Sequence, residues 1–382
     1  MADVHPIRRT CRFKPTDTGW QAIDLTPGVG SCVVQTDASL GQPFTVLHYL
    51  LHQRTARQRF VVSSEDVVVC DARRIVQLLR QARLRVAVVR HPMPYGDLSA
   101  QRVQRFATLA DLKRQHCTIE EMEEYEPHLE NGAVVFAGVD YAEILEKAAT
   151  DADVILWDGG NNDLPFYRPR LHVVVADPLR LGNELTYYPG EANLRMADVV
   201  VINKVDTADL AATEELRNHV RAANPEASIV EAASPVMADG AEQITGRRVL
   251  VVEDGPTLTH GEMRFGAGTV LARKFGAGEI VDPRPFAIGS IAATYTTYPG
   301  IGPLLPAMGY GDVQIRELES TIACVPCDVV IVGTPIDLSR LVKIDKPVVR
   351  VRYELQEIGR PADALTGLLK EIRRETQVHA AG

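Results

Sequence analysis

Four consecutive residues near the middle of the chain have the types and spacing of a loop that reads a guanine base. They are Asn203-Lys204-Val205-Asp206, and they directly follow an apolar run, 198–202, that predicts a buried strand. In such a loop the Asp206 carboxylate accepts two N–H bonds from the ring edge, while the Lys204 stem packs along the ring face. Ligands of α/β proteins usually bind at this carboxyl edge of the sheet. The pattern predicts nucleotide binding, with a solvated turn as the alternative.

Ser234 lies in a second short turn, which follows the next predicted strand, 228–231. Nucleotide-binding folds often place the backbone N–H groups of a small Ser/Ala turn beside the base. We therefore take Ser234 as a candidate nucleotide-binding residue, and an ordinary turn is the alternative.

Asp158 ends a predicted strand, 153–157, and two glycines follow it. A carboxylate in this position suits a magnesium ion beside phosphates, and glycines let the backbone approach closely. Asp158 is therefore a candidate catalytic residue and metal ligand. The alternative is a turn aspartate that accepts loop N–H groups.

Basic residues cluster after the strand predicted at 85–90. Arg90 and His91 come at its end, and we expect Arg102 and Arg105 one turn apart on a helix. Arg90, Arg102 and Arg105 are candidate binding residues for an anionic substrate. A solvated basic helix face is the alternative.

Two histidines are candidate catalytic residues. His91 follows Arg90, and His260 comes shortly after a predicted strand at 249–252. For His260 a structural role in a turn is the alternative.

Apolar runs alternate with amphipathic segments from residue 66 onward, which predicts a doubly wound, mostly parallel, P-loop-NTPase-like α/β sheet. A second, smaller α/β domain is expected at the C-terminal end. We expect an atypical or truncated region at 1–65, a nucleotide-binding domain at 66–246 and a C-terminal domain at 247–382. The strands predicted in the first domain are 67–70, 85–90, 133–136, 153–157, 171–176, 198–202 and 228–231.

Composition limits the classes of function. The chain of 382 residues has 41 Lys and Arg against 50 Asp and Glu, a net charge of −9, which argues against nucleic-acid binding. We see neither an apolar run long enough to span a membrane nor a secretory signal, and six scattered cysteines are typical of reduced thiols. We therefore expect a cytoplasmic protein without a membrane partner. The lone Cys324-Val325-Pro326-Cys327 predicts no metal site.

One element of a nucleotide site is missing. The phosphate-binding pattern G-x-x-x-x-G-K-[ST] occurs nowhere in the sequence. The chain thus carries a base-reading motif without the glycine-rich loop that normally holds the phosphates.

From about residue 74 to about residue 359 the chain closely resembles the cyclic 2,3-diphosphoglycerate synthetase family and its bacterial relatives, often described only as GTPases. The stretches that carry the resemblance are 89–98, 157–163, 185–191, 201–206, 253–261, 333–338 and 351–356.

The resemblance implies a ligase. ATP and Mg²⁺ would drive closure of an intramolecular phosphoanhydride on 2,3-diphosphoglycerate, with ADP and phosphate released. This chemistry requires neutralisation of charge around both substrate phosphates. By position Asp158 would lie on the magnesium side, and Arg90, His91, Arg102 and Arg105 would face the phosphates.

The resemblance leaves several alternatives open. Family members carry an N-terminal Rossmann-like domain and a phosphate-binding loop, so this chain is expected to be a degenerate paralogue or the product of an upstream frameshift or deletion. A GTP-binding switch, a metallochaperone and a non-catalytic remnant are the other functions considered. The guanine-type loop favours GTP and the family name implies ATP. A homodimer stays an alternative because nucleotide-binding proteins of this class often pair their sites.

Overall fold

The computed structural model describes residues 11–16, 19–24, 59–64, 70–91, 98–159, 164–259, 263–308 and 311–359. The chain separates into two compact units, Met1–Ala56 and Arg57–Gly382. In the first unit β1 (Cys11–Thr16) and β2 (Gly19–Asp24) form an antiparallel pair. Every other element belongs to the second unit. In the described part of the chain, no helix has the length and apolar character needed to cross a membrane.

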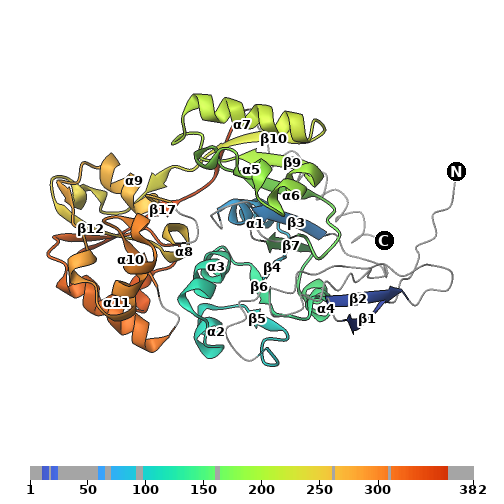
Figure 1. Ribbon diagram of the computed structural model, residues 1–382, viewed down its shortest axis with the longest axis horizontal. Helices are drawn as coiled ribbons and strands as arrows, with labels where there is room; N and C mark the ends of the chain where they lie inside the picture. The colour runs from blue at the N-terminus through green and yellow to red at the C-terminus, as the bar shows by residue number, and fades with distance from the viewer. Residues whose placement is uncertain are drawn as a thin grey trace. The chain divides into compact units, whose positions relative to one another are not determined.

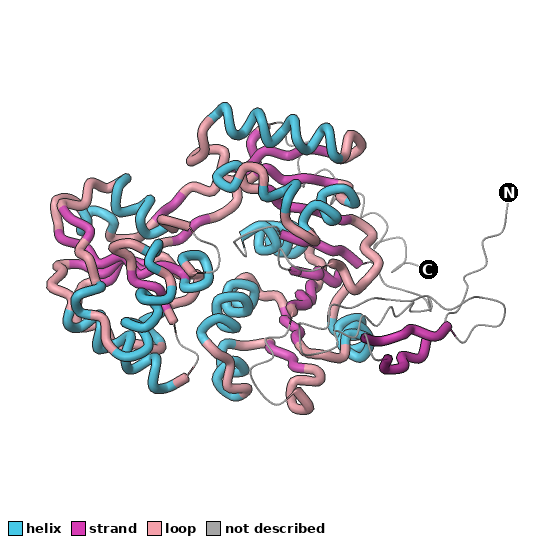
Figure 2. Tube along the Cα trace, viewed as in Figure 1, coloured by secondary structure: helices cyan, strands magenta, loops and turns pink. Residues whose placement is uncertain are grey.

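The larger sheet of the second unit has nine strands, which alternate with helices along the chain (Figures 1 and 2). They are β3 (Arg59–Ser64), β4 (Val86–Arg90), β5 (Gln104–Phe106), β6 (Val134–Ala137), β7 (Val154–Gly159), β8 (His172–Ala176), β9 (Val199–Ile202), β10 (Ser228–Ala233) and β18 (Gln356–Ile358). Their order is β18-β10-β9-β8-β3-β7-β4-β6-β5. The strands from β10 to β6 run parallel, and only β5 and β18, at the two edges, are antiparallel to their neighbours.

Helices cover both faces of this sheet, because its strands are apolar on both sides. On one face, α1 and α3 pack on side chains such as Val88 and Leu156. On the other face, α4, α6 and α7 pack on side chains such as Val89 and Val200. The helices of this part are α1 (Cys70–Gln81), α2 (Leu109–Arg114), α3 (Ile119–Glu130), α4 (Tyr141–Asp151), α5 (Asn183–Thr186), α6 (Gly190–Met196) and α7 (Leu210–Ala223).

The smaller sheet has five strands, of which β12 pairs with β13, β14 and β15, and β15 pairs with β16, all in parallel. Helices α10 and α11 pack on one face and α8 and α9 on the other. A two-stranded pair, β11 (Val236–Met237) and β17 (Arg352–Tyr353), lies outside both sheets. The remaining elements are β12 (Arg248–Asp254), β13 (Glu279–Ile280), β14 (Leu305–Ala307), β15 (Val329–Val332), β16 (Val348–Arg350), α8 (Gly255–Leu258), α9 (Ala267–Lys274), α10 (Gly289–Thr297) and α11 (Asp312–Cys324).

The predicted architecture is confirmed: this is an α/β fold with a doubly wound, mostly parallel sheet and a second, smaller parallel sheet. The second sheet begins at Arg248, next to the predicted boundary at residue 247. The chain later returns to the first sheet, because β18 pairs with β10.

Two local predictions are wrong. A strand was expected at 67–70, but Cys70 is the first residue of α1, and 67–69 lie outside the described residues. Arg102 and Arg105 were expected on a helix, but Arg105 lies in the edge strand β5 and Arg102 in the loop before it. A short run has too few residues for its period to distinguish the two structures.

Helix α3 joins the two sheets. Thr118 and Glu121 cap it reciprocally, each side chain accepting from the other's backbone N–H. Tyr125 packs in the core of the larger sheet, whereas Ile119 packs in the core of the smaller sheet among Leu250 and Leu305. The helix therefore contributes apolar side chains to both cores.

Glu253 organises the smaller sheet at the end of β12. Its buried carboxylate accepts hydrogen bonds from the backbone N–H groups of Gly266, Gly268 and Thr269 at the start of α9, and from the Thr269 hydroxyl. Burial raises the pKa of Glu253, and these hydrogen bonds oppose that rise. The carboxylate thus serves as the anion that the helix N-terminus favours.

Gly333 must stay a glycine for this carboxylate to fit. A Cβ atom at Gly333 would lie 2.3 Å from Oε2 of Glu253 and 2.8 Å from the backbone nitrogen of Gly268. We expect Gly333→Ala to lower the free energy of unfolding by about 1–3 kcal/mol, as overpacking does, measured by urea denaturation. The control is Gly300→Ala, because nothing lies within 4 Å of a Cβ there. Equal stability of the two variants would contradict the prediction.

Candidate functional site

Most sequence-predicted site residues lie at the carboxyl ends of neighbouring strands in the larger sheet. Arg90 ends β4, Asp158 is near the end of β7, Asn203 follows β9 and Ser234 follows β10. Because these strands run parallel, their ends meet at one edge of the sheet, which is the usual ligand-binding edge of such folds.

Arg90 and Asp158 form the centre of a buried ionic network. Nη1 of Arg90 lies 3.0 Å from Oδ2 of Asp158 and donates to its carbonyl oxygen at 2.8 Å. On its other side, the Arg90 guanidinium donates to Glu124 of α3, with Nη2 2.7 Å from Oε1 and Nε 3.1 Å from Oε2. His128 of α3 completes the network, because its Nε2 lies 2.8 Å from Oδ2 of Asp158.

The charges in this network follow from its burial and its contacts. Burial raises the pKa of Asp158, but the charge of Arg90 and the hydrogen bond of His128 outweigh burial and hold it below the ordinary value. Burial lowers the pKa of His128 below its ordinary value, although the hydrogen bond to Asp158 opposes this. Burial also disfavours the charged form of Arg90, yet Asp158 and Glu124 together raise its pKa. Near neutral pH Asp158 is therefore ionised, Arg90 is a cation and His128 is a neutral imidazole.

The tautomer of His128 follows from its partner. An ionised carboxylate can only accept, so Nε2 carries the proton and donates it to Asp158. Nδ1 is then an acceptor, and it has no hydrogen-bond partner among the residues that the structure describes. His128 is fully buried and Asp158 is 2% exposed. In this arrangement the imidazole of His128 holds the Asp158 carboxylate in place by donating a hydrogen bond to Oδ2.

Asp158 was also predicted to hold Mg²⁺. The arrangement does not favour direct ligation, since Oδ2 contacts both Arg90 and His128 and the side chain is buried. Within the described ranges, no three His, Cys, Asp or Glu side chains are grouped so that they could hold a metal ion. Direct metal binding by Asp158 stays a prediction.

The predicted base-reading loops lie beside each other. Oδ1 of Asp206 accepts a hydrogen bond from the backbone N–H of Ser234 at 2.9 Å. Val205 N–H donates to the carbonyl oxygen of Ala232. Lys204 has a φ of +57°, in the left-handed region. The backbone N–H of Lys204 donates to Oδ1 of Asn203. These contacts join the loop after β9 to the turn after β10.

Asp177 holds the side chain of Lys204. It follows β8, is buried, and accepts a hydrogen bond from Nζ of Lys204. The lysine ammonium is therefore fixed at the sheet edge, at the end of β8. Sequence reasoning missed Asp177, although it stands directly after a predicted strand as Asp158 does.

The other predicted basic residues are divided between the two edges of the sheet. Arg102 pairs with Asp140 and Glu143 at the start of α4, near the carboxyl edge. Arg105 pairs with Asp151 at the end of α4. Because α4 runs back along the sheet after β6, its end lies at the opposite edge, so Arg105 is not brought to Asp158.

The two predicted catalytic histidines are less well placed by the structure. His91 is exposed and directly follows Arg90. His260 lies outside the described residues, and so do 160–163 after Asp158. Sequence reasoning missed Glu124 and His128, which lie far from Asp158 in the sequence and reach it because α3 packs against β4 and β6.

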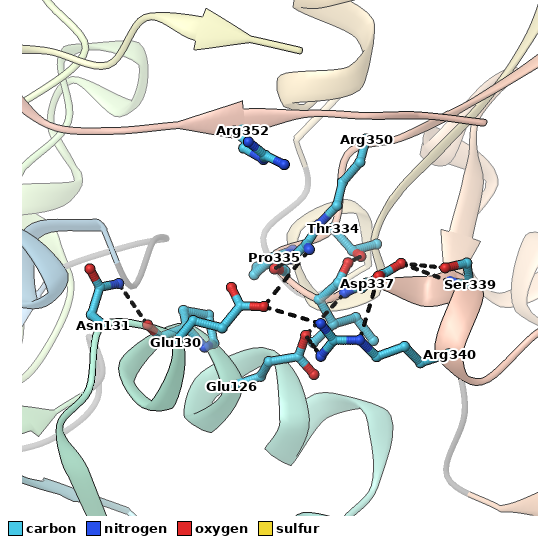
Figure 3. Close-up of polar contacts among 12 residues, drawn as sticks. Glu126, Glu130, Asn131, Thr334, Pro335, Asp337, Ser339, Arg340, Arg350 and Arg352 are labelled. Carbon is cyan, nitrogen blue, oxygen red and sulfur yellow. Dashed lines mark hydrogen bonds and ion pairs between the residues drawn. The ribbon is translucent and has the colours of Figure 1, made fainter. Parts of the chain in front are cut away.

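Helix α3 also carries ion pairs toward the smaller sheet (Figure 3). Glu126 accepts from Nη1 of Arg340 at 2.9 Å and from the backbone N–H of Asp337 at 3.3 Å. Glu130 lies 3.5 Å from Nη2 of Arg340 and 3.9 Å from Nη1 of Arg350. The helix that holds Arg90 and Asp158 is thus also bound to the loop after β15.

We expect the Arg90 network to be worth much more stability than the surface pairs. Arg90→Leu would leave Asp158 and Glu124 without their cation, and we expect a loss of about 3–5 kcal/mol in the free energy of unfolding. Arg102→Leu removes an exposed ion pair and should cost about 0–1 kcal/mol. Urea denaturation of both variants measures the difference. Similar losses would show that the Arg90 network does not stabilise the fold in this way.

No model of a known protein family matches the chain. Arginine synthetase ArcE of Thermococcus kodakarensis is 58% identical to it over 304 residues. The match covers 80% of this chain and 66% of that protein, so the chain spans slightly less than two thirds of the curated relative's length.

Solved structures with similar chain paths have low identity. LpxK from Aquifex aeolicus, in complex with ATP, has a TM-score of 0.47 and 10% identity, over 82% of this chain and 90% of that chain. The Zn(II)-bound YjiA GTPase from E. coli has a TM-score of 0.31 and 12% identity, over 46% of this chain and 57% of that chain. HypB from Archaeoglobus fulgidus has a TM-score of 0.30 and 17% identity, over 45% of this chain and 80% of that chain. We base no inference on these likenesses, because each TM-score is below 0.5.

The identity of 58% extends over four fifths of the chain and shows that the two proteins are related. The chain is therefore a relative of this arginine synthetase, and its motifs resemble those of the cyclic 2,3-diphosphoglycerate synthetase family.

Proposed function

We propose that this protein is a nucleotide-dependent synthetase, which binds ATP or GTP and uses phosphoryl transfer to activate a small phosphorylated substrate. One observation carries the proposal. The loop containing Asp206, joined to the turn at Ser234, lies at the same sheet edge as the buried Arg90–Asp158 pair. Base recognition and charge neutralisation would then take place at one edge, as phosphoryl transfer requires.

The base would be read by Asp206. Its Oδ1 accepts from Ser234, and a carboxylate has further lone pairs that can accept N–H groups from a guanine edge. Asp177 fixes the ammonium group of Lys204, so the lysine stem is held where it can lie along a ring face. This arrangement supports guanine, whereas the family name supports adenine.

Arg90 would neutralise a substrate phosphate. Its guanidinium is fully engaged by Asp158 and Glu124, and the Glu124 side chain is 25% exposed. A phosphate has the same bidentate geometry as a carboxylate, so it can replace Glu124 on the guanidinium. Asp158 would stay ionised and hold Arg90 in position. Mg²⁺ would enter on the nucleotide phosphates and supply further charge neutralisation.

The substrate is a proposal within the family. The resemblance implies ring closure of 2,3-diphosphoglycerate, whereas the relative is named for the synthesis of arginine. Family membership determines the class of reaction better than it determines the substrate. Stimulation of nucleotide hydrolysis by 2,3-diphosphoglycerate, compared with formation of arginine, distinguishes the two substrates.

The segment where the nucleotide phosphates would bind supports a second candidate function, that of a nucleotide-binding protein without catalytic activity. Strand β3 lies between β7 and β8 and is followed by α1, which is the position of a phosphate-binding loop in this fold class. The residues between them, 65–69, read Glu-Asp-Val-Val-Val and contain neither glycine nor lysine. A GTP-binding switch is a further alternative, supported by the guanine-type loop.

Nucleotide titration tests the proposal. We expect micromolar binding of ATP or GTP in the presence of Mg²⁺, measured by calorimetry on the full chain. Binding of neither up to millimolar concentration would contradict the proposal and support the non-catalytic protein. Binding of GTP without stimulation of hydrolysis by any small substrate would support the switch.

Substitution of Asp206 by asparagine tests the role of the base-reading loop. In Asp206→Asn the amide offers one acceptor and one donor, which matches xanthine better than guanine. If the loop reads guanine, GTP affinity should fall at least about tenfold, or about 1.4 kcal/mol, and xanthosine triphosphate should bind better than in the wild type. The matched control is Asp239→Asn, because Asp239 is exposed and pairs with Arg352. Unchanged GTP affinity in Asp206→Asn would remove Asp206 from the site.

A further inference from the structure

Two arginines, Arg350 and Arg352, lie on one face of the chain segment that leaves the smaller sheet. Arg350 is the last residue of β16, and Arg352 is the first residue of β17. Their neighbours Val349 and Val351 are buried in the core of the smaller sheet. Because side chains alternate along an extended chain, the two arginines share the opposite face. Figure 3 shows both of them on the side of this segment that faces Glu130 of α3.

The segment connects the carboxyl edges of the two sheets. β16 runs parallel to β15, and β15 to β12, so Arg350 lies at the carboxyl edge of the smaller sheet. After β17 the chain enters β18, where Gln356 pairs with Ala233, the last residue of β10, at the carboxyl edge of the larger sheet. Ligands of parallel α/β sheets usually bind at such edges. Arg350 and Arg352 therefore belong to a segment that runs between two edges of this kind.

Tyr353 connects this segment to the start of α1. The guanidinium carbon of Arg73, in the first turn of α1, lies 5.3 Å from the centroid of the Tyr353 ring. Helix α1 follows β3, and the connection between a central strand and its helix is where a phosphate-binding loop is found in folds of this class. The segment with Arg350 and Arg352 thus approaches the end of the larger sheet at which nucleotide phosphates would bind.

The guanidinium of Arg350 has few partners. Within the described ranges its one hydrogen bond runs from Nη2 to the carbonyl oxygen of Pro335, at 2.8 Å. Nε is buried and has no hydrogen-bond partner among the described residues. Nη1 lies 3.9 Å from Oε1 of Glu130, beyond hydrogen-bonding distance, and that same oxygen accepts from Arg340 at 3.5 Å. Most N–H donors of Arg350 are therefore unused by the part of the chain that the structure describes.

Arg352 is more accessible than Arg350. Its side chain is 63% exposed and that of its partner Asp239 is 88% exposed, with Nη1 of the arginine 3.2 Å from Oδ2 of the aspartate. An ion pair this exposed contributes little stability, so another anion can replace Asp239. Arg340 differs, because carboxylates of α3 and of its own loop pair with all three of its guanidinium nitrogens. Arg350 and Arg352 thus retain the capacity to bind a further anion.

We propose that Arg350 and Arg352 bind a phosphate group at this face and thereby supply cations that the sequence at 65–69 lacks. Each guanidinium presents planar pairs of N–H groups, which match the oxygens of a phosphate. The phosphate displaces Asp239 from Arg352 and uses the remaining donors of Arg350. It belongs either to the nucleotide or to the phosphorylated substrate, so the inference rests on the proposed function for the source of its ligand.

Binding of phosphate compounds to the full chain tests this inference. Inorganic phosphate, 2,3-diphosphoglycerate, and ATP and GTP with Mg²⁺ are each titrated by calorimetry into the wild type, Arg350→Gln and Arg352→Gln. We expect the wild type to bind at least one of these probes with a Kd below about 1 mM, and each variant to bind that probe at least about tenfold more weakly. The matched control is Arg248→Gln, which should bind as the wild type does. Arg248 forms an exposed ion pair with Asp328 at the amino end of β12, away from this face.

The pattern of loss identifies the source of the phosphate. Weaker binding of 2,3-diphosphoglycerate and inorganic phosphate alone assigns the site to the substrate, whereas weaker binding of ATP or GTP assigns it to the nucleotide. A wild type that binds no probe, or a folded variant that binds every probe as the wild type does, would overturn the inference. If Arg350→Gln does not fold, Arg352→Gln decides, because its exposed side chain contributes little to stability.

The same titrations separate this inference from the proposed function. If the wild type binds a nucleotide and neither arginine variant changes the binding of any probe, this inference fails and the proposed function stands. If the chain binds no nucleotide but loses phosphate binding in both variants, the phosphate site stands and the proposed function fails.

Discussion

The burial of acidic side chains on α3 is the constraint on which the rest of this structure depends. Six of its twelve residues are glutamates, and several are buried between two sheets. A buried carboxylate without a partner costs several kcal/mol, so each must find a donor or keep its proton. The donors come from both sheets: Arg90 from the larger one, and Arg340 and Arg350 from the smaller one. These pairs fix the position of α3 and of the residues that it holds at the sheet edge.

The carboxyl edge of the larger sheet has two parts. The part at β9 and β10 carries the residues proposed to bind a base, whereas the part at β3 lacks the residues that usually bind phosphates. On the side of β9 and β10, the Asp206 carboxylate accepts from Ser234 and the Lys204 ammonium donates to Asp177, so the loop that we propose reads the base is held in place. At β3 the topology keeps the central place of a phosphate-binding strand, but residues 65–69 lack the glycines and lysine that would bind phosphates. Any phosphate at this edge must therefore rely on other cations. Arg90 lies at this edge and could bind a phosphate, although its guanidinium already pairs with Asp158 and Glu124.

The sequence allowed the fold class to be predicted because the buried parallel strands are continuous apolar runs, as at 198–202, and strand ends placed Asp158 and Asn203 at one edge. The same logic could have found Asp177. It could not find α3, since a helix of six glutamates with Pro127 near its end reads as a solvated segment until its partners are known. Glu124 and His128 are therefore invisible to local reasoning. Their roles arise from contacts between residues far apart in the sequence.

The pairing of Arg90 with Glu124 links the larger sheet to the acidic side chains of α3. An anion that binds the Arg90 guanidinium must displace Glu124, and this leaves the Glu124 carboxylate without its cation, one residue away from Glu123. The charge of Glu124 already raises the pKa of the buried Glu123 carboxyl, and without Arg90 beside it that charge would act more strongly. Anion binding at Arg90 and protonation of Glu123 would therefore favour each other, and thermodynamic linkage makes this coupling reciprocal.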